Sequence, residues 1–266
     1  MNVHERKMLD ILRRGREEFG VVATKAEFEA EGTRTDELLR LLEIAHKADV
    51  GLALKIGGCE AIRDLLEAKQ FGVRYIIAPM VETPYALSKY IAAKNKVFSA
   101  LEQEDVAFLF NVETVTAFNH INELVDVACQ RPGCDGVVFG RVDFSGSLGL
   151  GRECIESEQI TQPGEEIARL CCAKSLQFVV GGAVSSDALS SLRRFHAIRL
   201  DRFETRKVVF AGSALAGVNL PEALRHAVHF ELLWLLNKRE YYGLMHQEDQ
   251  ARIEMLESRW RVLDQP

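Results

Sequence analysis

The sequence predicts a single (β/α)₈ TIM barrel, and three observations support this prediction. Short apolar runs rich in Val and Phe alternate with amphipathic helical stretches. The chain has 266 residues, close to the roughly 250 of one such barrel. Two apolar runs end in a carboxylate, Glu113 and Asp143, where a buried parallel strand passes into a loop. In a parallel barrel these strand ends form the floor of the active site.

Seven strands are recognisable along the chain. They are expected near residues 21–29, 52–57, 75–80, 106–112, 136–143, 177–183 and 199–210. The eighth strand lies either in the second half of the long run 197–210 or in a segment that the pattern does not reveal. One domain therefore covers residues 1–266, with extra helices at both ends.

The C-terminal extension, residues 220–266, is predicted to be helical throughout. Apolar side chains such as Phe230, Leu233 and Trp234 are too crowded there for a free tail. We therefore expect a homo-oligomer in which this extension packs on a neighbouring subunit.

Composition and charge exclude several classes of protein. The net charge of −6 and the absence of a basic run argue against a nucleic-acid partner. No run approaches the roughly 18 apolar residues of a membrane span, and residues 1–20 lack the apolar core of a signal peptide. The six cysteines show no CxxC pairing, so most are expected to be buried in a reducing cytosol. We expect a cytoplasmic protein that acts on small molecules.

Side-chain alternation predicts which groups point into the barrel. In residues 24–31 the charged set alternates with small and apolar residues that would pack on the outer helices. That charged set is Lys25, Glu27, Glu29 and Glu31. The same alternation directs Lys55 inward, pairs Asn111 with Glu113, and pairs Arg141 with Asp143. Lysines and carboxylates that converge on one mouth indicate a site for an anionic substrate.

Two inward carboxylates on neighbouring strands favour a hard divalent cation, Mg²⁺ or Mn²⁺. The segment around Glu113 has an echo at Glu82, because both acids stand between Val and Thr after a strand. The echo is either a structural repeat or two strand-to-helix turns built alike, and we favour the second. Only one of the two acids is expected to bind metal.

Three segments resemble the HpcH/HpaI aldolase and citrate lyase β-subunit family. Residues 111–114 (Asn-Val-Glu-Thr) and 140–149 (Gly-Arg-Val-Asp-Phe-Ser-Gly-Ser-Leu-Gly) are similar to its paired acidic signatures, and residues 77–83 to its preceding strand. The resemblance covers roughly residues 20–215. It implies a TIM barrel, and it assigns the metal to Glu113 and Asp143, with Glu82 a non-ligand.

The resemblance also implies the chemistry, which is making or breaking a carbon–carbon bond. In the family a divalent metal chelates a 2-oxo acid such as pyruvate, or supports a carboxylated acyl substrate, and stabilises an enolate. Lys55 stands near the place of the family's substrate-gripping Arg. The motif also places Gly140 and Arg141 beside the substrate, with Arg141 where the family has Pro.

One departure affects the general base. The family's aldolases carry a His after an Asp-Gly-Glu sequence, whereas here residues 29–32 read Glu-Ala-Glu-Gly with no His following. The candidates that remain for catalysis are Lys25, Glu29, Glu31 and Lys55. We expect an aldolase that joins or releases a 2-oxo acid and an aldehyde, and a sugar-derived aldehyde would suit the many polar groups at the mouth.

Three alternatives stay open. The chain could cleave an acyl or CoA-thioester substrate as in the citrate-lyase branch, which also lacks that His. Lys25 or Lys55 could form a Schiff base if its pKa were depressed. Finally, the barrel could bind a ligand without catalysing a reaction.

Overall fold

A computed structural model describes residues 1–217 and 219–263 of the chain. Eight strands form one closed barrel in the order of the sequence, which confirms the predicted fold class. The strands are β1 (Val21–Glu27), β2 (Gly51–Lys55), β3 (Tyr75–Ala78), β4 (Ala107–Val112), β5 (Gly136–Gly140), β6 (Gln177–Gly181), β7 (Arg202–Glu204) and β8 (Val208–Ala211).

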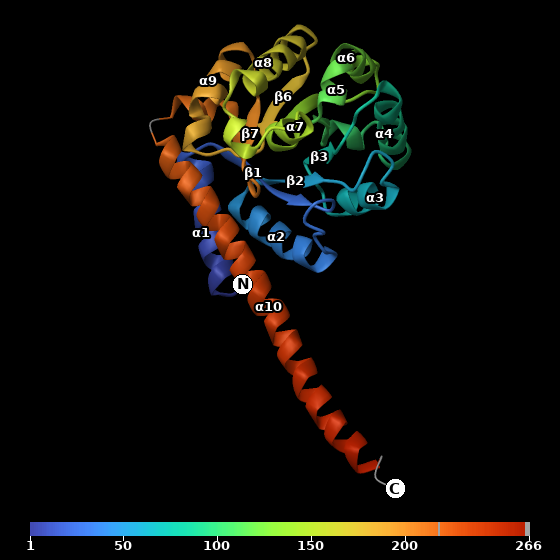
Figure 1. The fold of residues 1–266 in the computed structure, drawn as a ribbon, viewed down its shortest axis with the longest axis vertical. Helices are drawn as coiled ribbons and strands as arrows, with labels where there is room; N and C mark the ends of the chain where they lie inside the picture. Colours follow the sequence, from blue (N-terminus) through green and yellow to red (C-terminus); the bar gives the residue numbers. More distant parts are fainter. Residues whose placement is uncertain (218, 264–266) are drawn as a thin grey trace.

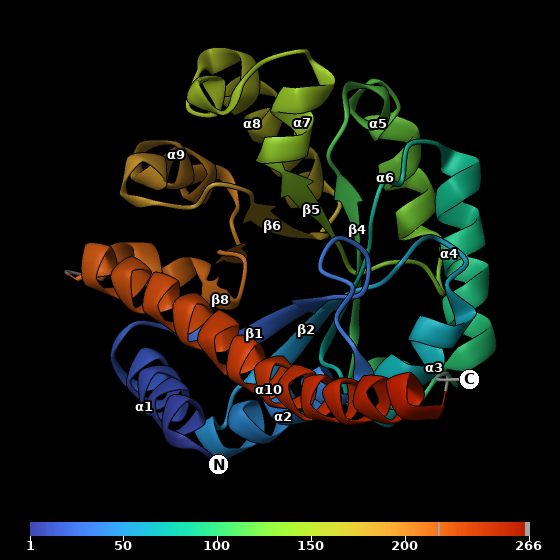
Figure 2. The same cartoon turned by 60° about the horizontal axis from the view of Figure 1, so that its bottom comes forward.

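Helices surround the strands and cover the outside of the barrel (Figures 1 and 2). They are α1 (Val3–Glu18), α2 (Thr35–Ala48), α3 (Ile62–Gln70), α4 (Pro84–Val97), α5 (Val115–Asn119), α6 (Ile121–Cys129), α7 (Arg141–Ser147), α8 (Glu158–Ala173), α9 (Leu189–Ile198) and α10 (Leu220–Leu263). Four short 3₁₀ turns add to them: η1 (Glu102–Glu104), η2 (Arg152–Cys154), η3 (Ser186–Ala188) and η4 (Gly212–Ala216). Within the described part of the chain, no helix is both long and apolar enough to cross a membrane.

Two apolar layers hold the barrel together. The larger layer lies between the strands and the helices and contains most of the buried Leu, Ile and Phe side chains. A smaller layer fills the interior, from Ala23, Ala53, Tyr75, Ile77, Leu109, Val138, Val179 and Val209. This inner layer separates two polar ends, because parallel strands place the residues before and after it at opposite mouths.

The eighth strand departs from an all-parallel barrel. The strands β1 to β7 pair in parallel, whereas β8 runs antiparallel to both β7 and β1. Both β7 and β8 come from the run 197–210, so the expected eighth strand does lie in its second half. Only Thr205, Arg206 and Lys207 separate the two strands, and a parallel return would need a crossover of a dozen or more residues.

The echo between residues 81–84 and 112–115 is two helix starts built alike. The Thr83 side chain accepts a hydrogen bond from the Ala86 N–H at 3.1 Å, and Thr114 accepts one from the Ala117 N–H at the same distance. Each Thr is thus the N-cap of the helix that follows its strand.

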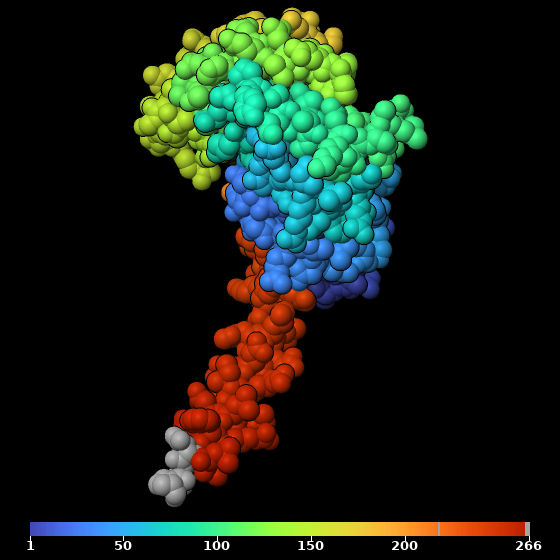
Figure 3. All heavy atoms as spheres, turned by 90° about the vertical axis from the view of Figure 1, so that its right-hand side faces the viewer, coloured from blue at the N-terminus to red at the C-terminus, as the bar shows by residue number. Residues whose placement is uncertain are grey.

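The helix α10 has two unlike halves. Its first half packs against α1 and buries Phe230, Leu233 and Trp234. Every residue from Leu244 to Leu263 is exposed, and this half projects away from the barrel (Figures 1 and 3). The predicted helical extension is therefore present as one continuous helix, although residues 264–266 lie outside the described part.

The cysteine prediction needs a correction. All six cysteines are free thiols, but only Cys134 and Cys171 are buried. The other four lie on outer helices, turns or loops where their side chains reach solvent in part or fully.

Candidate active site

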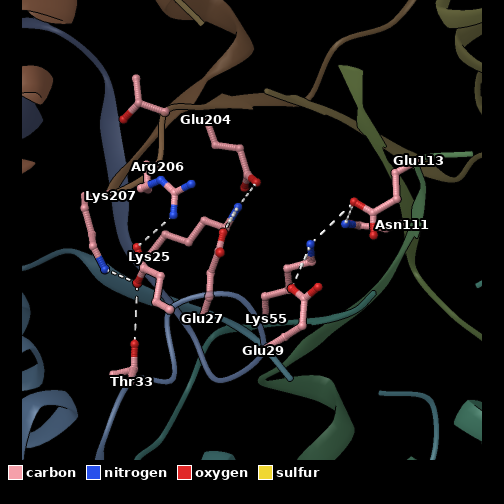
Figure 4. A network of polar contacts seen from close by, with 12 residues as sticks. Lys25, Glu27, Glu29, Thr33, Lys55, Asn111, Glu113, Glu204, Arg206 and Lys207 are labelled. Carbon is pink, nitrogen blue, oxygen red and sulfur yellow. Dashed lines mark hydrogen bonds and ion pairs between the residues drawn. The ribbon is translucent and has the colours of Figure 1, made fainter. Parts of the chain in front are cut away.

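The C-terminal mouth of the barrel contains a polar cavity of about 540 Å³. Its walls include Lys25 and Glu27 from β1, Lys55 from β2, Asn111 and Glu113 from the end of β4, and Glu204 from β7. These side chains point toward one another across the mouth (Figure 4). The inward alternation predicted for these strands is therefore confirmed at Lys25, Lys55, Asn111 and Glu113.

Glu113 is the most enclosed acid of the site, with 1% of its surface exposed. Its Oε1 accepts the Met80 N–H at 2.9 Å, and its Oε2 accepts the Asn111 amide at 2.6 Å. The Lys55 ammonium lies 3.4 Å from the same Oε2. Burial raises the pKa of Glu113 above its ordinary value, and the nearby Asp143 charge adds to this, while Lys55 only partly offsets it.

Gly140 makes room for this carboxylate. A Cβ at position 140 would lie 2.8 Å from both the Cβ and the Oε2 of Glu113, closer than real contacts allow. Gly140 also lines the cavity, so a substrate can approach the backbone there.

Each inward lysine has two carboxylate partners. Lys25 contacts Glu204 and lies 3.1 Å from Glu27. Burial alone would lower the pKa of Lys25, but the two carboxylates outweigh it and raise that pKa. The pKa of Lys55 is raised as well, because Glu113 and Glu29 (3.1 Å) overcome its burial. Both lysines are therefore held as ammonium ions, which removes the depressed pKa that a Schiff-base lysine needs.

Two of the predicted site residues do not face the cavity. Arg141 is fully buried and donates to Glu156 (2.8 Å), to Ser191 (3.1 Å) and to the carbonyl of Gly182 (2.8 Å). The strand β5 ends at Gly140, so Arg141 begins a helix and turns away from the mouth. Arg141 therefore does not line the cavity, although it was expected to contact substrate, and its guanidinium instead anchors the loop after β6.

Glu31 also lies outside the cavity. The strand β1 ends at Glu27, so the alternation no longer holds at position 31. Glu31 instead contacts Lys207 and lies 3.5 Å from Arg206 in the β7–β8 turn. Glu31 thus joins two loops and, although it was predicted as a catalytic candidate, does not line the cavity, whereas Glu29 does.

The sequence did not predict four residues that line the mouth. Glu204 was hidden because residues 199–210 looked like one strand, although the triplet Arg202-Phe-Glu204 carries the same period of two. Arg152, Arg206 and Glu231 complete the rim from η2, the β7–β8 turn and α10. No local pattern marks these three, because the fold alone brings them to the mouth.

The donor atoms fit a hard divalent cation. Glu113 and the exposed Asp143 line the same cavity, and the Asn111 carbonyl oxygen is buried there without a hydrogen-bond partner among the described residues. Carboxylate and amide oxygens are the ligands that Mg²⁺ and Mn²⁺ prefer. Among the described residues, no cluster of three or more His, Cys, Asp or Glu side chains is arranged to hold an ion. A cation here would thus use few protein ligands, with substrate or water completing its shell.

Comparison with known proteins identifies the family. The profile described as HpcH/HpaI aldolase/citrate lyase matches residues 36–189. The chain belongs to the HpcH/HpaI aldolase/citrate lyase family. It is accordingly a carbon–carbon lyase with small-molecule substrates, in a family that is generally dependent on a divalent metal. No curated protein sequence is similar enough to match the chain.

Three solved structures share the fold, and two of them are described as members of the HpcH/HpaI family. An HpcH/HpaI aldolase from Desulfitobacterium hafniense DCB-2 has 16% identity and a TM-score of 0.58, over 75% of this chain and 82% of that one. A family protein from Burkholderia cenocepacia J2315 has 15% identity and a TM-score of 0.60, over 84% and 89%. A variant of the citrate synthase SbnG has 15% identity and a TM-score of 0.56, over 89% and 90%.

Proposed function

We propose that this mouth catalyses reversible aldol-type cleavage and formation of a carbon–carbon bond. A pyruvate-like 2-oxo acid supplies the enolate, an aldehyde is the acceptor, and Mg²⁺ or Mn²⁺ is the cofactor. The observation that carries the proposal is that Glu113 and Asp143 line one cavity beside the buried, inward ammonium of Lys55.

Glu113, Asp143 and the Asn111 carbonyl oxygen would hold the cation. When bound, the cation would withdraw charge from the 2-oxo acid and stabilise its enolate. Lys55 would bind the substrate carboxylate, which it can do as a point charge but without the bidentate fork of an Arg. Arg152, which is exposed at the rim, supplies a second cation for the far end of an anionic substrate.

Glu29 is the best-placed proton acceptor of the four catalytic candidates. Lys25 is held as an ammonium ion by Glu27 and Glu204, and Glu31 lies outside the cavity. Glu29 lines the cavity and its side chain is 27% exposed, so its carboxylate can reach a bound substrate while keeping contact with Lys55.

Proton NMR of pyruvate in D₂O with enzyme and Mg²⁺ tests the enolate directly. We expect the methyl signal to disappear faster with the wild-type enzyme than with a Glu113→Gln control. The metal requirement is tested in the same assay after EDTA treatment and elemental analysis. Exchange at the full rate in metal-free enzyme would contradict the cofactor. Borohydride trapping is expected to leave Lys25 and Lys55 unmodified, and a trapped adduct would restore the Schiff-base alternative.

A second function is favoured by one observation, the absence of a His after residues 29–32. This feature suits cleavage of an acyl or CoA-thioester substrate. Cleavage of a malyl- or citramalyl-type thioester, with no exchange of pyruvate, oxaloacetate or 2-oxobutanoate, would replace the aldolase proposal. A barrel that only binds a ligand would give neither reaction.

We also propose that the enzyme is a homo-oligomer assembled through α10. Large apolar side chains lie uncovered on its second half, including Leu244, Ile253, Leu256, Trp260 and Leu263. A neighbouring copy that covers them would remove a large apolar surface from water. A monodisperse monomer in light scattering at micromolar concentration would contradict this assembly.

A further inference from the structure

The N-terminal end of the barrel, opposite the catalytic mouth, contains a second cavity. Its volume is about 810 Å³, and its walls come from the beginnings of β3, β4, β6 and β7 and from the loops before β4 and β5. A smaller hollow of about 360 Å³ adjoins it and shares Gln103, Arg131 and Asp135 with its walls. The two hollows therefore form one polar region at this end.

Arg202 brings a cation into this cavity from inside the barrel. Its guanidinium lies 4.3 Å from the centre of the Tyr75 ring and donates to the Gln177 side chain at 2.6 Å. Across residues 1–217 and 219–263, no carboxylate lies within 4.0 Å of its nitrogens. Burial lowers the pKa of Arg202, and the more distant Tyr75, Asp201 and Glu204 only partly offset this.

Lys94 is a second cation of this kind beside the smaller hollow. Only 1% of its surface is exposed, and its ammonium donates to the amide oxygens of Asn95 (2.8 Å) and Gln103 (2.7 Å). It also lies 4.8 Å from the centre of the Phe108 ring. Its pKa is lowered by burial, and no ion pair joins it to any acid of the described chain.

The acids at this end do not neutralise these two cations. Asp135 is already engaged, because it accepts the Phe108 N–H at 2.8 Å and lies 3.4 Å from Arg131. Glu104 and Asp105 line the cavity but are exposed to solvent. Arg74 adds another guanidinium at the rim, 5.6 Å from the same Tyr75 ring. The cavity thus offers unpaired cations to whatever enters it.

From these contacts we infer that the N-terminal cavity binds a small anion that carries a phosphate or carboxylate group, held by Arg202 and Arg74. A guanidinium supplies parallel N–H donors that match either group. An anion beside Arg202 would provide the counter-charge that the protein does not, and Lys94 would add a favourable field. The site is separate from the catalytic mouth, because the two cavities share no lining residue and the inner apolar layer of the barrel lies between them.

Ligand-observed NMR at constant ionic strength tests the site with two probes, inorganic phosphate by ³¹P and acetate by ¹³C. Comparison of the two affinities shows which anion the cavity prefers. Arg202→Gln is expected to weaken binding of the preferred probe by about tenfold or more, as for loss of a charged hydrogen-bond pair. Arg74→Gln should weaken it about threefold, and since Arg74 is exposed this variant is safe for folding.

Two control variants show whether a change in affinity is specific to the N-terminal cavity. Arg63→Gln removes an 86% exposed arginine of α3 whose one acidic partner within the described residues is Glu67, and it should leave both affinities unchanged. Lys55→Gln alters the catalytic mouth, so it removes any anion bound there and should leave the binding that depends on Arg202 unchanged. Equal binding by wild type and Arg74→Gln, loss of binding in Lys55→Gln, or no binding of either probe would each overturn the inference. None of these results depends on the proposed aldolase reaction.

Discussion

The two ends of the barrel differ in whether their positively charged side chains have carboxylate partners. At the C-terminal mouth, Lys25 and Lys55 each lie within 4.0 Å of two carboxylates. At the N-terminal end, Arg202 and Lys94 have no carboxylate at that distance within the described chain. The two lysines of the mouth are therefore neutralised by the protein itself, and a substrate must compete with internal partners for Lys55. At the opposite end, the proposed anion would supply the counter-charge that Arg202 lacks.

The largest expected effect comes from the two acids of the mouth. Glu113→Gln or Asp143→Asn should each lower kcat/KM by about 10²- to 10³-fold, because each removes a charge that would hold the cation. The matched control is Glu82→Gln, which changes the equivalent acid of the other turn and should retain activity. Steady-state kinetics measures all three, and an inactive Glu82→Gln would remove the distinction between the two turns.

Glu113→Gln should not destabilise the fold. Burial raises the pKa of Glu113, so folding works against the charged form of this side chain, and a neutral Gln of the same shape avoids that cost. We expect a melting temperature equal to or above that of the wild type in circular dichroism. A clear fall would mean that the contact with Lys55 outweighs the burial of the charge.

The variant Lys25→Met tests whether the ion pairs at the mouth stabilise the folded protein. Lys25→Met would leave Glu27 and Glu204 buried without their cation, at a cost of about 3–5 kcal/mol in the free energy of unfolding. The exposed pair of Lys47 with Glu43 provides the control, and Lys47→Met should cost less than about 1 kcal/mol. Urea unfolding gives both values. An equal loss of unfolding free energy in Lys25→Met and Lys47→Met would show that the buried ion pairs stabilise the fold no more than an exposed one.

Acid unfolding is expected to show a smaller contribution from Glu27. Although burial opposes it, Lys25 and Lys55 hold the pKa of Glu27 below its ordinary value of 4.5. A depressed pKa gives stability that is present above pH 4.5 and is lost as the pH falls through the lower, folded value. Wild type should therefore exceed Glu27→Gln in unfolding free energy at pH 7, and the difference should shrink in acid. A difference that is constant with pH would exclude this ion pair as its source.

Much of the mouth could be predicted from sequence because strand alternation is local. Lys25, Lys55 and Asn111 follow from a period of two within strands whose ends were placed nearly correctly, and Glu113 keeps this alternation one residue past the end of β4. Arg141 and Glu31 do not face the cavity, because Arg141 already belongs to α7 and Glu31 lies in a loop four residues after β1. Beyond a strand end, the direction of a side chain depends on the turn and no longer on the alternation.

The partners of each charge could not be predicted from the sequence. Glu204 reaches Lys25 across 179 positions of the chain, and only the closure of the barrel brings β7 beside β1 through β8. The short turn at residues 205–207 reverses the chain, so β8 runs antiparallel to β7. The missing carboxylates around Arg202 and Lys94 likewise depend on the whole fold rather than on neighbouring residues.

The reversal at β8 also decides on which side of the barrel the enzyme can meet another copy. Because β8 runs from the C-terminal mouth to the N-terminal end of the barrel, α10 begins beside Gly20 at that N-terminal end. From there α10 runs back along α1. Val228 of α10 lies at the rim of the catalytic cavity. Further along α10, the Tyr242 hydroxyl donates to Glu37 near the start of α2, and α2 begins at the C-terminal end of the barrel. The free half, residues 244–263, then extends about 30 Å beyond the barrel, past α1 and α2 (Figure 1). A second copy that packs on this half would therefore lie beside α1 and α2, across the barrel from the helices α5 to α8.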